Sequence, residues 1–552
     1  MGGIALKGKT AVLTVVLLVL SMALSACGVQ NTGQNKQQSS PGDQVKPAEI
    51  TANLQTEPQS IDPAKNTAID GGTVIYHVFE GLTRLDKNNK AQPAVAKSWD
   101  ISADNLTYTF HLRDGVKWSD GTAVTAKDFE YAWKRVLNPD TGSEYAYQLY
   151  YIKNGEKYNT GKAKAEDVGV AAKGDGTLVL TLESPTPYIL ELLAFFTYMP
   201  VRKDIVEAHP EDWTQSPNTY IGDGAFVMDA WNHNDSIILG KNPEYWDIKR
   251  IKPDKVTFLM INDSSTELAE FENGRLDFGS NPPADDFQRL KEKGVLNIDP
   301  NLATYGYLFN TKAAPFDDPK VRKAFSLAID RKAIVETPPS TGEKPAGGWV
   351  SPGIPDADPT KDFRDVGGNY YDIDKADAEE AQKLLSEAGY PGGKGLPKVT
   401  LLYNTSEDHK RIAEMLQEMW KKNLGVDVQL SNEEWQVFLQ DRANGKYQLA
   451  RLGWFADYID PMTFLDMFTT GSGNNDADWS NAEYDKLIAK AKQTNDPAER
   501  MKYMHQAEDI LMDQMVVLPI YFYIDDYVAQ TNLKGYHEDP LGYSYFHEAY
   551  KE

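Results

Sequence analysis

The sequence predicts an α/β fold, and two observations indicate it. Short strand patterns alternate with helix patterns in the second half of the chain, and the connections between them are short. Such alternation is typical of a parallel sheet with right-handed crossovers. The chain also has 552 residues, which is too many for one hydrophobic core and favours two or three domains. The alternating strands are expected at 399–403, 426–430 and 447–452, with helices from about 412 to Gly425 and at 433–444.

The first half mixes strands and helices less regularly. Leu106 to Arg113 alternates apolar and polar residues as a half-buried strand does. From Thr125 to Leu137, apolar residues recur at i, i+3, i+4 and i+7, which predicts an amphipathic helix. The other elements expected here are strands at 50–54, 178–182, 237–239 and 256–259, and helices at 71–81, 187–196 and 265–273.

Between the two halves, Thr337 to Tyr371 is rich in Pro, Gly and Asp and is expected to be either an ordered wrap or a mobile flap. Helices are expected on both sides of it and towards the carboxyl end, at 318–330, 374–388, 462–468, 482–493 and 497–514, with a last strand at 516–524.

Composition excludes some classes of function. The chain has 57 Lys and Arg against 81 Asp and Glu, a net charge of −24, which disfavours nucleic acid and anionic membrane surfaces as partners. Its 29 Tyr and 11 Trp carry polar atoms on large rings, so they suit a hydrated cleft as well as a core.

The N-terminus predicts secretion. Lys7 and Lys9 precede an apolar run that ends in Leu-Ser-Ala before Cys27, which is typical of a signal peptide over 1–26. Cys27 is the only cysteine, so the chain has no intramolecular disulfide and no cysteine-based metal site. The Leu-Ser-Ala-Cys stretch resembles the lipobox of bacterial lipoproteins, which implies cleavage before Cys27 and acylation, as by palmitate, of its sulfur. Residues 27–47 are then the lipidated cysteine and a flexible tether.

Known catalytic motifs are missing. The sequence has no Gly-x-Ser-x-Gly elbow and no His-Glu-x-x-His helix, and its eight histidines show no paired ligand spacing. Glycine-rich stretches at 389–394 and 471–473 only partly match phosphate-binding loops, and the acidic run 372–377 reads as a helix cap instead of a calcium loop. We therefore expect no enzyme activity, no metal and no cofactor. Because carboxylate pairs can meet in space, a surface hydrolase stays an alternative.

One segment, 447–458, combines both charge signs with a flat apolar wall. Arg451, Trp454 and Asp457 lie at the carboxyl end of an expected strand that stops at Gly453. Ligands often bind beyond the carboxyl ends of strands in open α/β sheets. The alternative is an Arg451–Asp457 ion pair that holds a loop, with Trp454 in the core.

Nine segments, in order along residues 54–550, resemble the oligopeptide-binding lipoproteins of ABC importers, in extracellular solute-binding protein family 5. They are 73–83, 108–113, 118–122, 128–133, 242–246, 321–325, 402–406, 420–425 and the Gly-Trp-Phe-Ala-Asp-Tyr run at 453–458. The resemblance implies a two-lobed clamp like that of periplasmic binding proteins (type II, cluster C-like), with an extra inserted domain and a hinge between the lobes. It implies a discontinuous domain I at 48–69, 205–306 and 525–552, an inserted domain II at 70–204, and an α/β domain III at 307–524.

The resemblance also implies a ligand-binding site. Asp457 matches the aspartate that binds the peptide ammonium, Tyr145 the tyrosine that supports it, and Trp454 and Trp435 the pocket walls. Phe455 holds a variable position of the motif and is expected to reshape a pocket. The remaining matches are Arg451 and His409, which meet the peptide carboxylate, and Glu57, a loop acid near the ligand. The residues alone leave open that Trp435 packs in a core and that His409 is a solvated helix residue.

The function that this implies is capture without chemistry. The expected protein is a monomeric receptor, lipid-anchored on the extracytoplasmic face of the cell membrane, that binds short peptides. Its further partners are the permease and ATPase subunits of an ABC importer. The alternative on the same scaffold is a receptor for a dipeptide, a murein peptide, nickel or haem.

Overall fold

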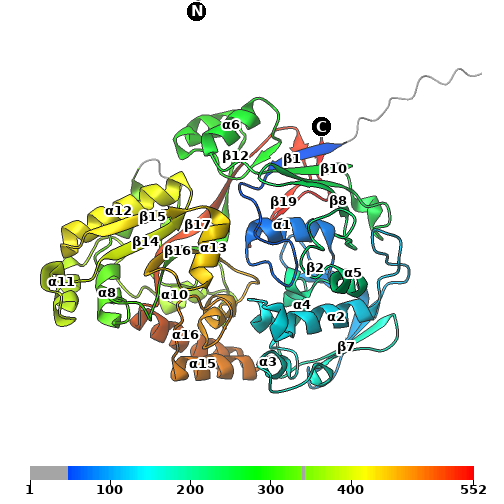
Figure 1. The fold of residues 1–552 in the computed structure, drawn as a ribbon, viewed down its shortest axis with the longest axis horizontal. Coiled ribbons are helices and arrows are strands. Elements are labelled where there is room, and N and C mark those ends of the chain that lie inside the picture. The colour runs from blue at the N-terminus through cyan, green and yellow to red at the C-terminus, as the bar shows by residue number, and fades with distance from the viewer. Residues whose placement is uncertain (1–47, 338–341) are drawn as a thin grey trace, which may run out of the picture. The chain divides into compact units, whose positions relative to one another are not determined.

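One large mixed sheet organises the computed structural model, which describes residues 48–337 and 342–552 (Figure 1). Its strands follow the order β15, β14, β16, β12, β17, β11, β1, β10, β9 and β8, and the short β13 also pairs with β17. The predicted signal peptide, Cys27 and tether lie outside the described residues and stay predictions.

The second half forms the α/β lobe that the sequence predicts. Its three parallel strands are connected by two helices that lie beside the sheet (Figure 1). In chain order these elements are β14 (Val399–Asn404), α12 (Glu407–Leu424), β15 (Val428–Glu433), α13 (Trp435–Ala443) and β16 (Leu449–Phe455). Helix α12 ends where Gly425 adopts a left-handed conformation, with φ of 72°, which glycine accepts without steric cost.

Two long antiparallel strands, β12 (Leu296–Phe309) and β17 (Val517–Ala529), run between the two halves (Figure 1). Register shifts interrupt their pairing at two places, the second directly before Gly306. A Cβ atom there would lie 2.6 Å from the backbone oxygen of Leu518, so this close approach requires glycine. The two halves are thus the lobes of a two-lobed protein, joined by a pair of irregular strands.

The other lobe holds the rest of the large sheet and a separate four-stranded sheet of order β4, β5, β7 and β6. Helix α2 (Ala126–Leu137) covers this smaller region and buries Phe129 and Trp133 as the periodicity predicts. The indole of Trp133 donates to the backbone oxygen of Tyr198 at 2.8 Å. The strands of this lobe are β1 (Glu49–Asn53), β2 (Thr83–Leu85), β3 (Ala91–Pro93), β4 (Ala96–Ile101), β5 (Thr107–Leu112), β6 (Val170–Ala172), β7 (Thr177–Thr181), β8 (Phe226–Asn232), β9 (Ser236–Lys241), β10 (Lys255–Leu259) and β11 (Phe278–Gly279).

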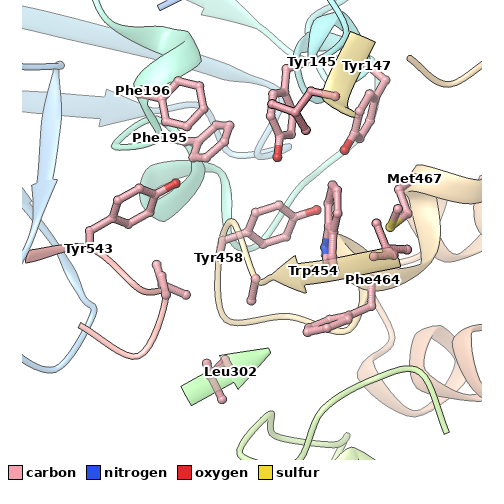
Figure 2. Packing of buried hydrophobic residues seen from close by; sticks show 14 of the residues in the cluster. Tyr145, Tyr147, Phe195, Phe196, Leu302, Trp454, Tyr458, Phe464, Met467 and Tyr543 are labelled. Atoms are coloured by element: carbon pink, nitrogen blue, oxygen red, sulfur yellow. The ribbon is translucent and has the colours of Figure 1, made fainter. Parts of the chain in front are cut away.

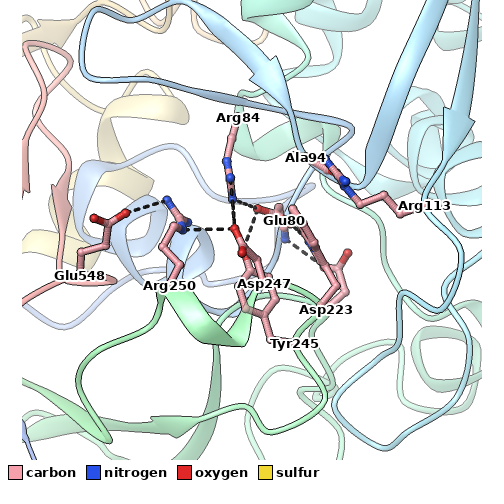
Figure 3. A network of polar contacts seen from close by, with 10 residues as sticks. Glu80, Arg84, Ala94, Arg113, Asp223, Tyr245, Asp247, Arg250 and Glu548 are labelled. Atoms are coloured by element: carbon pink, nitrogen blue, oxygen red, sulfur yellow. Dashed lines mark hydrogen bonds and ion pairs between the residues drawn. The ribbon is translucent and has the colours of Figure 1, made fainter.

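A polar network joins segments of this lobe that are far apart in the sequence (Figure 3). Arg84 forms ion pairs with Glu80 and with Asp247, at 3.3 and 3.2 Å. Arg250 pairs with Asp247 and with Glu548 near the carboxyl end of the chain, at 3.6 and 3.4 Å. The network therefore ties residues 80–84, 247–250 and the C-terminal segment together.

Several predicted elements have other bounds in the structure. Strand β16 does not stop at Gly453 but continues to Phe455, because Gly453 and Trp454 keep pairing with β12. The helix expected at 187–196 is wrong: it is only α4 (Ile189–Leu192), followed by a 3₁₀ turn at Phe196–Tyr198. The helix expected from 374 begins at Ala378, because the Asp377 carboxylate caps it by accepting from the amide of Glu380.

The segment 342–371 is an ordered wrap, one of the two alternatives. It contains β13 (Lys344–Pro345) and α10 (Phe363–Gly367), and it is fixed to α16 (Pro497–Asp513) by one buried carboxylate. Glu508 accepts hydrogen bonds from the amides of Trp349 and Val350, at 3.0 and 2.9 Å, and pairs with Arg364.

The predicted domain boundaries stay predictions, because residues 47–552 group as one compact unit. Within the described ranges, no helix has the length and apolar character needed to cross a membrane. The other α-helices described are α1 (Ile69–Val78), α3 (Gly155–Asn159), α5 (Lys203–Ala208), α6 (Ser264–Glu272), α7 (Phe287–Lys293), α8 (Pro319–Leu327), α9 (Arg331–Glu336), α11 (Ala378–Glu387), α14 (Met462–Leu465) and α15 (Ala482–Gln493). Short strands complete the C-terminal segment: β18 (Leu533–Lys534), β19 (His537–Glu538), β20 (Ser544–Tyr545) and β21 (Tyr550–Lys551).

Candidate ligand-binding cleft

A cavity of about 420 Å³ lies between the two lobes, and residues of both lobes line it. The α/β lobe contributes the carboxyl end of β16 and the first residues of α12 and α13, and the other lobe contributes α1 and the loop before it. Seven of the eight predicted site residues line this cavity: Tyr145, His409, Trp435, Arg451, Trp454, Phe455 and Asp457.

Asp457 is a buried carboxylate held by residues of both lobes. It lies directly after β16, and its side chain is 7% exposed. From the opposite lobe, the Tyr145 hydroxyl donates to Oδ1 at 3.0 Å and the Gln148 amide donates to Oδ2 at 2.8 Å. From its own lobe, the Thr463 hydroxyl donates to Oδ2 at 3.1 Å. Burial raises the pKa of Asp457 to about 8, so in this state the carboxyl group holds its proton at neutral pH.

Aromatic rings surround Tyr145, one of the donors to Asp457 (Figure 2). Tyr145 precedes a 3₁₀ turn at Ala146–Leu149, which brings Gln148 to the same side. The Tyr145 ring packs edge-on against Phe195 and Phe196, with ring centres 5.2 and 5.8 Å away, and tilted against Trp454 across the cleft. These contacts leave the Tyr145 hydroxyl directed at the α/β lobe.

Arg451 is a buried cation in the same cavity, and the expected alternative of an Arg451–Asp457 ion pair is wrong. The side chain is 9% exposed, and its Nη2 donates to the Tyr523 hydroxyl at 2.6 Å. The guanidinium carbon lies 5.2 Å from the ring centre of Tyr305. Its Nε finds no acceptor, and no carboxylate in the described part of the chain lies within ion-pair distance of it. A buried cation without a carboxylate partner can bind an anionic group of a ligand.

His409 lies in the first turn of α12 and faces the cavity. Its Nδ1 is 3.3 Å from the Tyr305 hydroxyl. Burial, and then the charge of Arg451, lower the pKa of His409 well below its ordinary value, so the ring is neutral. It can therefore exchange hydrogen bonds with a ligand but adds no charge.

Trp435 is both a wall residue and a link between lobes. Its indole donates to the Asp70 carboxylate of the other lobe at 3.0 Å, while its ring stacks on Phe438, 6.0 Å away between centres. Phe455 also lines the cavity, with its ring centre 5.0 Å from that of Tyr523.

Glu57 does not line the cavity: its carboxylate accepts from the ring of His233 and the amide of Asn234. A direct contact between Glu57 and a ligand therefore stays a prediction.

Three polar residues at the site were not among the predicted ones. Gln148 and Thr463 bind Asp457, and Asp70 binds Trp435 with a pKa that burial raises to about 6. Thr463 lies only six residues after Asp457, just beyond the segment 447–458 that the sequence singled out. Nothing in the sequence marks Gln148, which is 309 residues away from its partner.

Contacts between the lobes extend beyond the cavity. The amide of Asn474 donates to the Tyr147 hydroxyl at 3.2 Å, and the Ser184 hydroxyl donates to the backbone of Lys492 at 2.7 Å. Tyr188 stacks on Tyr458 with ring centres 5.0 Å apart. The lobes therefore touch at several points around the cavity.

Solved structures show the same arrangement of lobes. A complex of Haemophilus influenzae OppA with RPPGFSPFR is 35% identical, with a TM-score of 0.86 over 92% of this chain and 99% of that one. The Escherichia coli murein tripeptide-binding protein MppA is 36% identical, with a TM-score of 0.85 over 92% of this chain and 99% of that one. An unliganded open form of MppA has a TM-score of only 0.60, at 36% identity and over 92% of this chain. The lobes are thus closed.

Sequence comparison extends the likeness to the whole chain. Oligopeptide-binding protein OppA of Bacillus subtilis is 42% identical over 553 residues, which cover 99% of this chain and 100% of that protein. Residues 90–476 match the family model of bacterial extracellular solute-binding proteins, family 5 middle. A family match over most of the chain, with the closed two-lobed fold and its central cavity, identifies the chain as a member of the bacterial extracellular solute-binding proteins of family 5.

Proposed function

We propose that this protein captures short peptides in the cavity between its lobes and delivers them to the permease of an ABC importer. Its similarity to oligopeptide-binding proteins supports this function. One observation carries the proposal: the cavity holds a buried carboxylate, Asp457, and a buried cation, Arg451, that do not pair with each other. A peptide has the complementary pair of charges at its ends, whatever its sequence.

Asp457 would bind the α-ammonium group of the peptide. An ammonium donates three hydrogen bonds and restores the charge of a carboxylate that burial has neutralised. Leaving either partner unpaired in a closed cleft costs roughly 3–5 kcal/mol, which would make a free N-terminus a condition for tight binding. Tyr145 and Gln148 donate to Asp457 from the opposite lobe, so the same contact would couple ligand binding to closure.

Arg451 would bind the terminal carboxylate, with the neutral His409 as a hydrogen-bonding neighbour. Trp435, Trp454 and Phe455 would form walls around the ligand, whose backbone can be held without reading its side chains. The protein would return the peptide intact, since capture needs no bond to break.

The same proposal covers the parts of the chain outside the described residues. A signal peptide would direct export, and acyl chains on Cys27 would hold the monomer at the extracytoplasmic face of the membrane.

Three domains would form the clamp, with β12 and β17 as the hinge. They are domain I (48–69, 205–306 and 525–552), domain II (70–204) and domain III (307–524).

Calorimetry with free and N-acetylated forms of one tetrapeptide tests this function. The free form is expected to bind about 100-fold or more tightly, because acetylation removes the cation that Asp457 receives. In Asp457→Ala the two forms should bind equally weakly, whereas Asp427→Ala, which changes an exposed side chain, should behave as wild type. Equal affinity of both forms for the wild type would exclude the ammonium contact, and no binding of any peptide would exclude the function.

A further inference from the structure

One end of the cavity presents hydrogen-bond acceptors and carboxylates without matching donors. Asp525 and Asp526 lie on β17 where this strand passes between the lobes, and Glu343 lies directly before β13, which pairs with β17 beside Tyr523. None of these three carboxylates forms a hydrogen bond or an ion pair with another side chain of the described ranges 48–337 and 342–552. Burial, and then repulsion by Glu343, Asp525 and Asp408, raise the pKa of Asp526 well above its ordinary value.

Two buried amides point to the same kind of ligand. Asn301 lies in the irregular stretch of β12 directly after Pro300, which pairs with Ile524. Asn404 lies at the carboxyl end of β14. Both line the cavity, both are only 7% exposed, and the Oδ1 atom of each has no hydrogen-bond donor in the described part of the protein. A buried acceptor without a donor costs free energy, which a ligand with N–H groups would recover.

The chemistry of this end therefore favours a cation. An isolated metal ion fits poorly, because no group of three or more His, Cys, Asp or Glu in the described residues is arranged to hold one. A lysine ammonium or an arginine guanidinium supplies several donors and a positive charge on a long stem, and it forms strong hydrogen bonds with carboxylates.

The position relative to Arg451 indicates which part of a peptide would reach this end. Arg451 donates to the hydroxyl of Tyr523, which precedes Asp525 by two residues. The Tyr523 hydroxyl is also close enough to Glu343 for the charge of that carboxylate to act on it. If Arg451 receives the terminal carboxylate, the side chains nearest the carboxyl end of the peptide lie beside the three acids.

We propose that Glu343, Asp525 and Asp526 form a subsite for a basic side chain near the carboxyl end of the peptide, so that the protein prefers peptides with Lys or Arg there. This inference rests on the proposed peptide-binding function. It adds selectivity to a cavity whose other contacts address only the peptide termini and backbone.

Calorimetry with Ala-Ala-Ala-Lys and Ala-Ala-Ala-norleucine tests the subsite, because norleucine keeps the stem of lysine without its ammonium. The wild type is expected to bind the lysine peptide about tenfold more tightly or better. In Asp525→Asn/Asp526→Asn this ratio should fall to about one, with the affinity for the norleucine peptide unchanged.

A matched control separates the subsite from the net charge of −24, which attracts any cation. Asp114→Asn/Asp427→Asn removes two carboxylates whose side chains are 100% and 84% exposed, and it should keep the lysine preference. Should the cavity variant fail to fold, Ala-Ala-Ala-Glu tests the wild type directly, because repulsion by the acids should make it bind more weakly than the norleucine peptide.

Three results would overturn the inference. Tight but equal binding of the lysine and norleucine peptides would remove the subsite and leave the peptide receptor intact. A lysine preference that persists in Asp525→Asn/Asp526→Asn would place the cation elsewhere. If the control variant lost the lysine preference equally, the preference would come from the net charge of the protein and not from the three acids. Failure of all three peptides to bind would instead contradict the proposed function.

Discussion

At the scale of single residues, the protonation of Asp457 is central to the proposed peptide capture. The pKa of this group is about 8 in the folded protein against an ordinary value of 3.8, so the folded state binds the additional proton between these two pH values. The free energy of unfolding of the ligand-free protein therefore falls as the pH rises from about 4 to about 8.

Asp457→Asn removes this dependence, because an amide does not ionise. We expect the midpoint of thermal unfolding of the ligand-free variant to exceed that of the wild type at about pH 8, and the difference to shrink at about pH 5. Peptide binding should be lost at both pH values. A variant that is equally destabilised at both would show that Asp457 acts through its hydrogen bonds and not through its charge.

Arg451 gives a second prediction at this scale. Amidation of the peptide carboxylate should weaken binding to the wild type by about tenfold or more, because a buried cation loses its partner. In Arg451→Met, the acid and the amide should bind alike, which calorimetry on the four combinations measures as a coupling energy. Lys410→Met, which changes an exposed side chain on α12, serves as control. An unchanged preference for the acid in Arg451→Met would place the carboxylate at another residue.

The sequence indicated most of the residues around the cavity, but it did so through one short segment and a family resemblance. Arg451, Trp454, Phe455 and Asp457 lie within seven positions, so their proximity follows from chain connectivity. Gln148 reaches Asp457 only because the lobes close, and no local pattern encodes a contact across 309 residues. Glu57 shows the opposite case, since it matches the family position yet bonds to His233 outside the cavity lining.

At the scale of elements, local signals predicted the helices best. Glycine ends α12, and apolar periodicity marks α2, because both act within a few turns of one helix. The bounds of β16 and β17 depend on partner strands, and β12 holds both of them in pairing beyond the residues where their own patterns end. The composition of 337–371 could not distinguish a wrap from a flap, since a single distant carboxylate, Glu508, decides it.

The Glu508 carboxylate gives a testable prediction at the scale of elements. Glu508→Gln leaves the buried guanidinium of Arg364 without its counter-charge, and we expect the free energy of unfolding in urea to fall by roughly 3–5 kcal/mol. Glu207→Gln, which removes an exposed helical pair with Lys203 at 3.7 Å, should change it by less than about 0.5 kcal/mol. Equal effects of the two substitutions would mean that Glu508 does not anchor the wrap.

At the scale of the whole molecule, the lobes are closed over a cavity whose charges complement a peptide. Anchoring is a separate property with its own prediction. We expect Cys27→Ser to abolish incorporation of labelled palmitate and to shift the protein from the membrane to the soluble fraction, with peptide affinity unchanged. A variant that stays acylated on the membrane would contradict the predicted lipidation site.

The most direct test of the central claim is mass spectrometry of the small molecules that denaturation releases from the purified protein. A receptor that reads termini and backbone should release a mixture of short peptides of diverse sequence, all with free termini and enriched in Lys or Arg near the carboxyl end. Release of one defined non-peptide compound would contradict the account and favour a specialised receptor on the same scaffold.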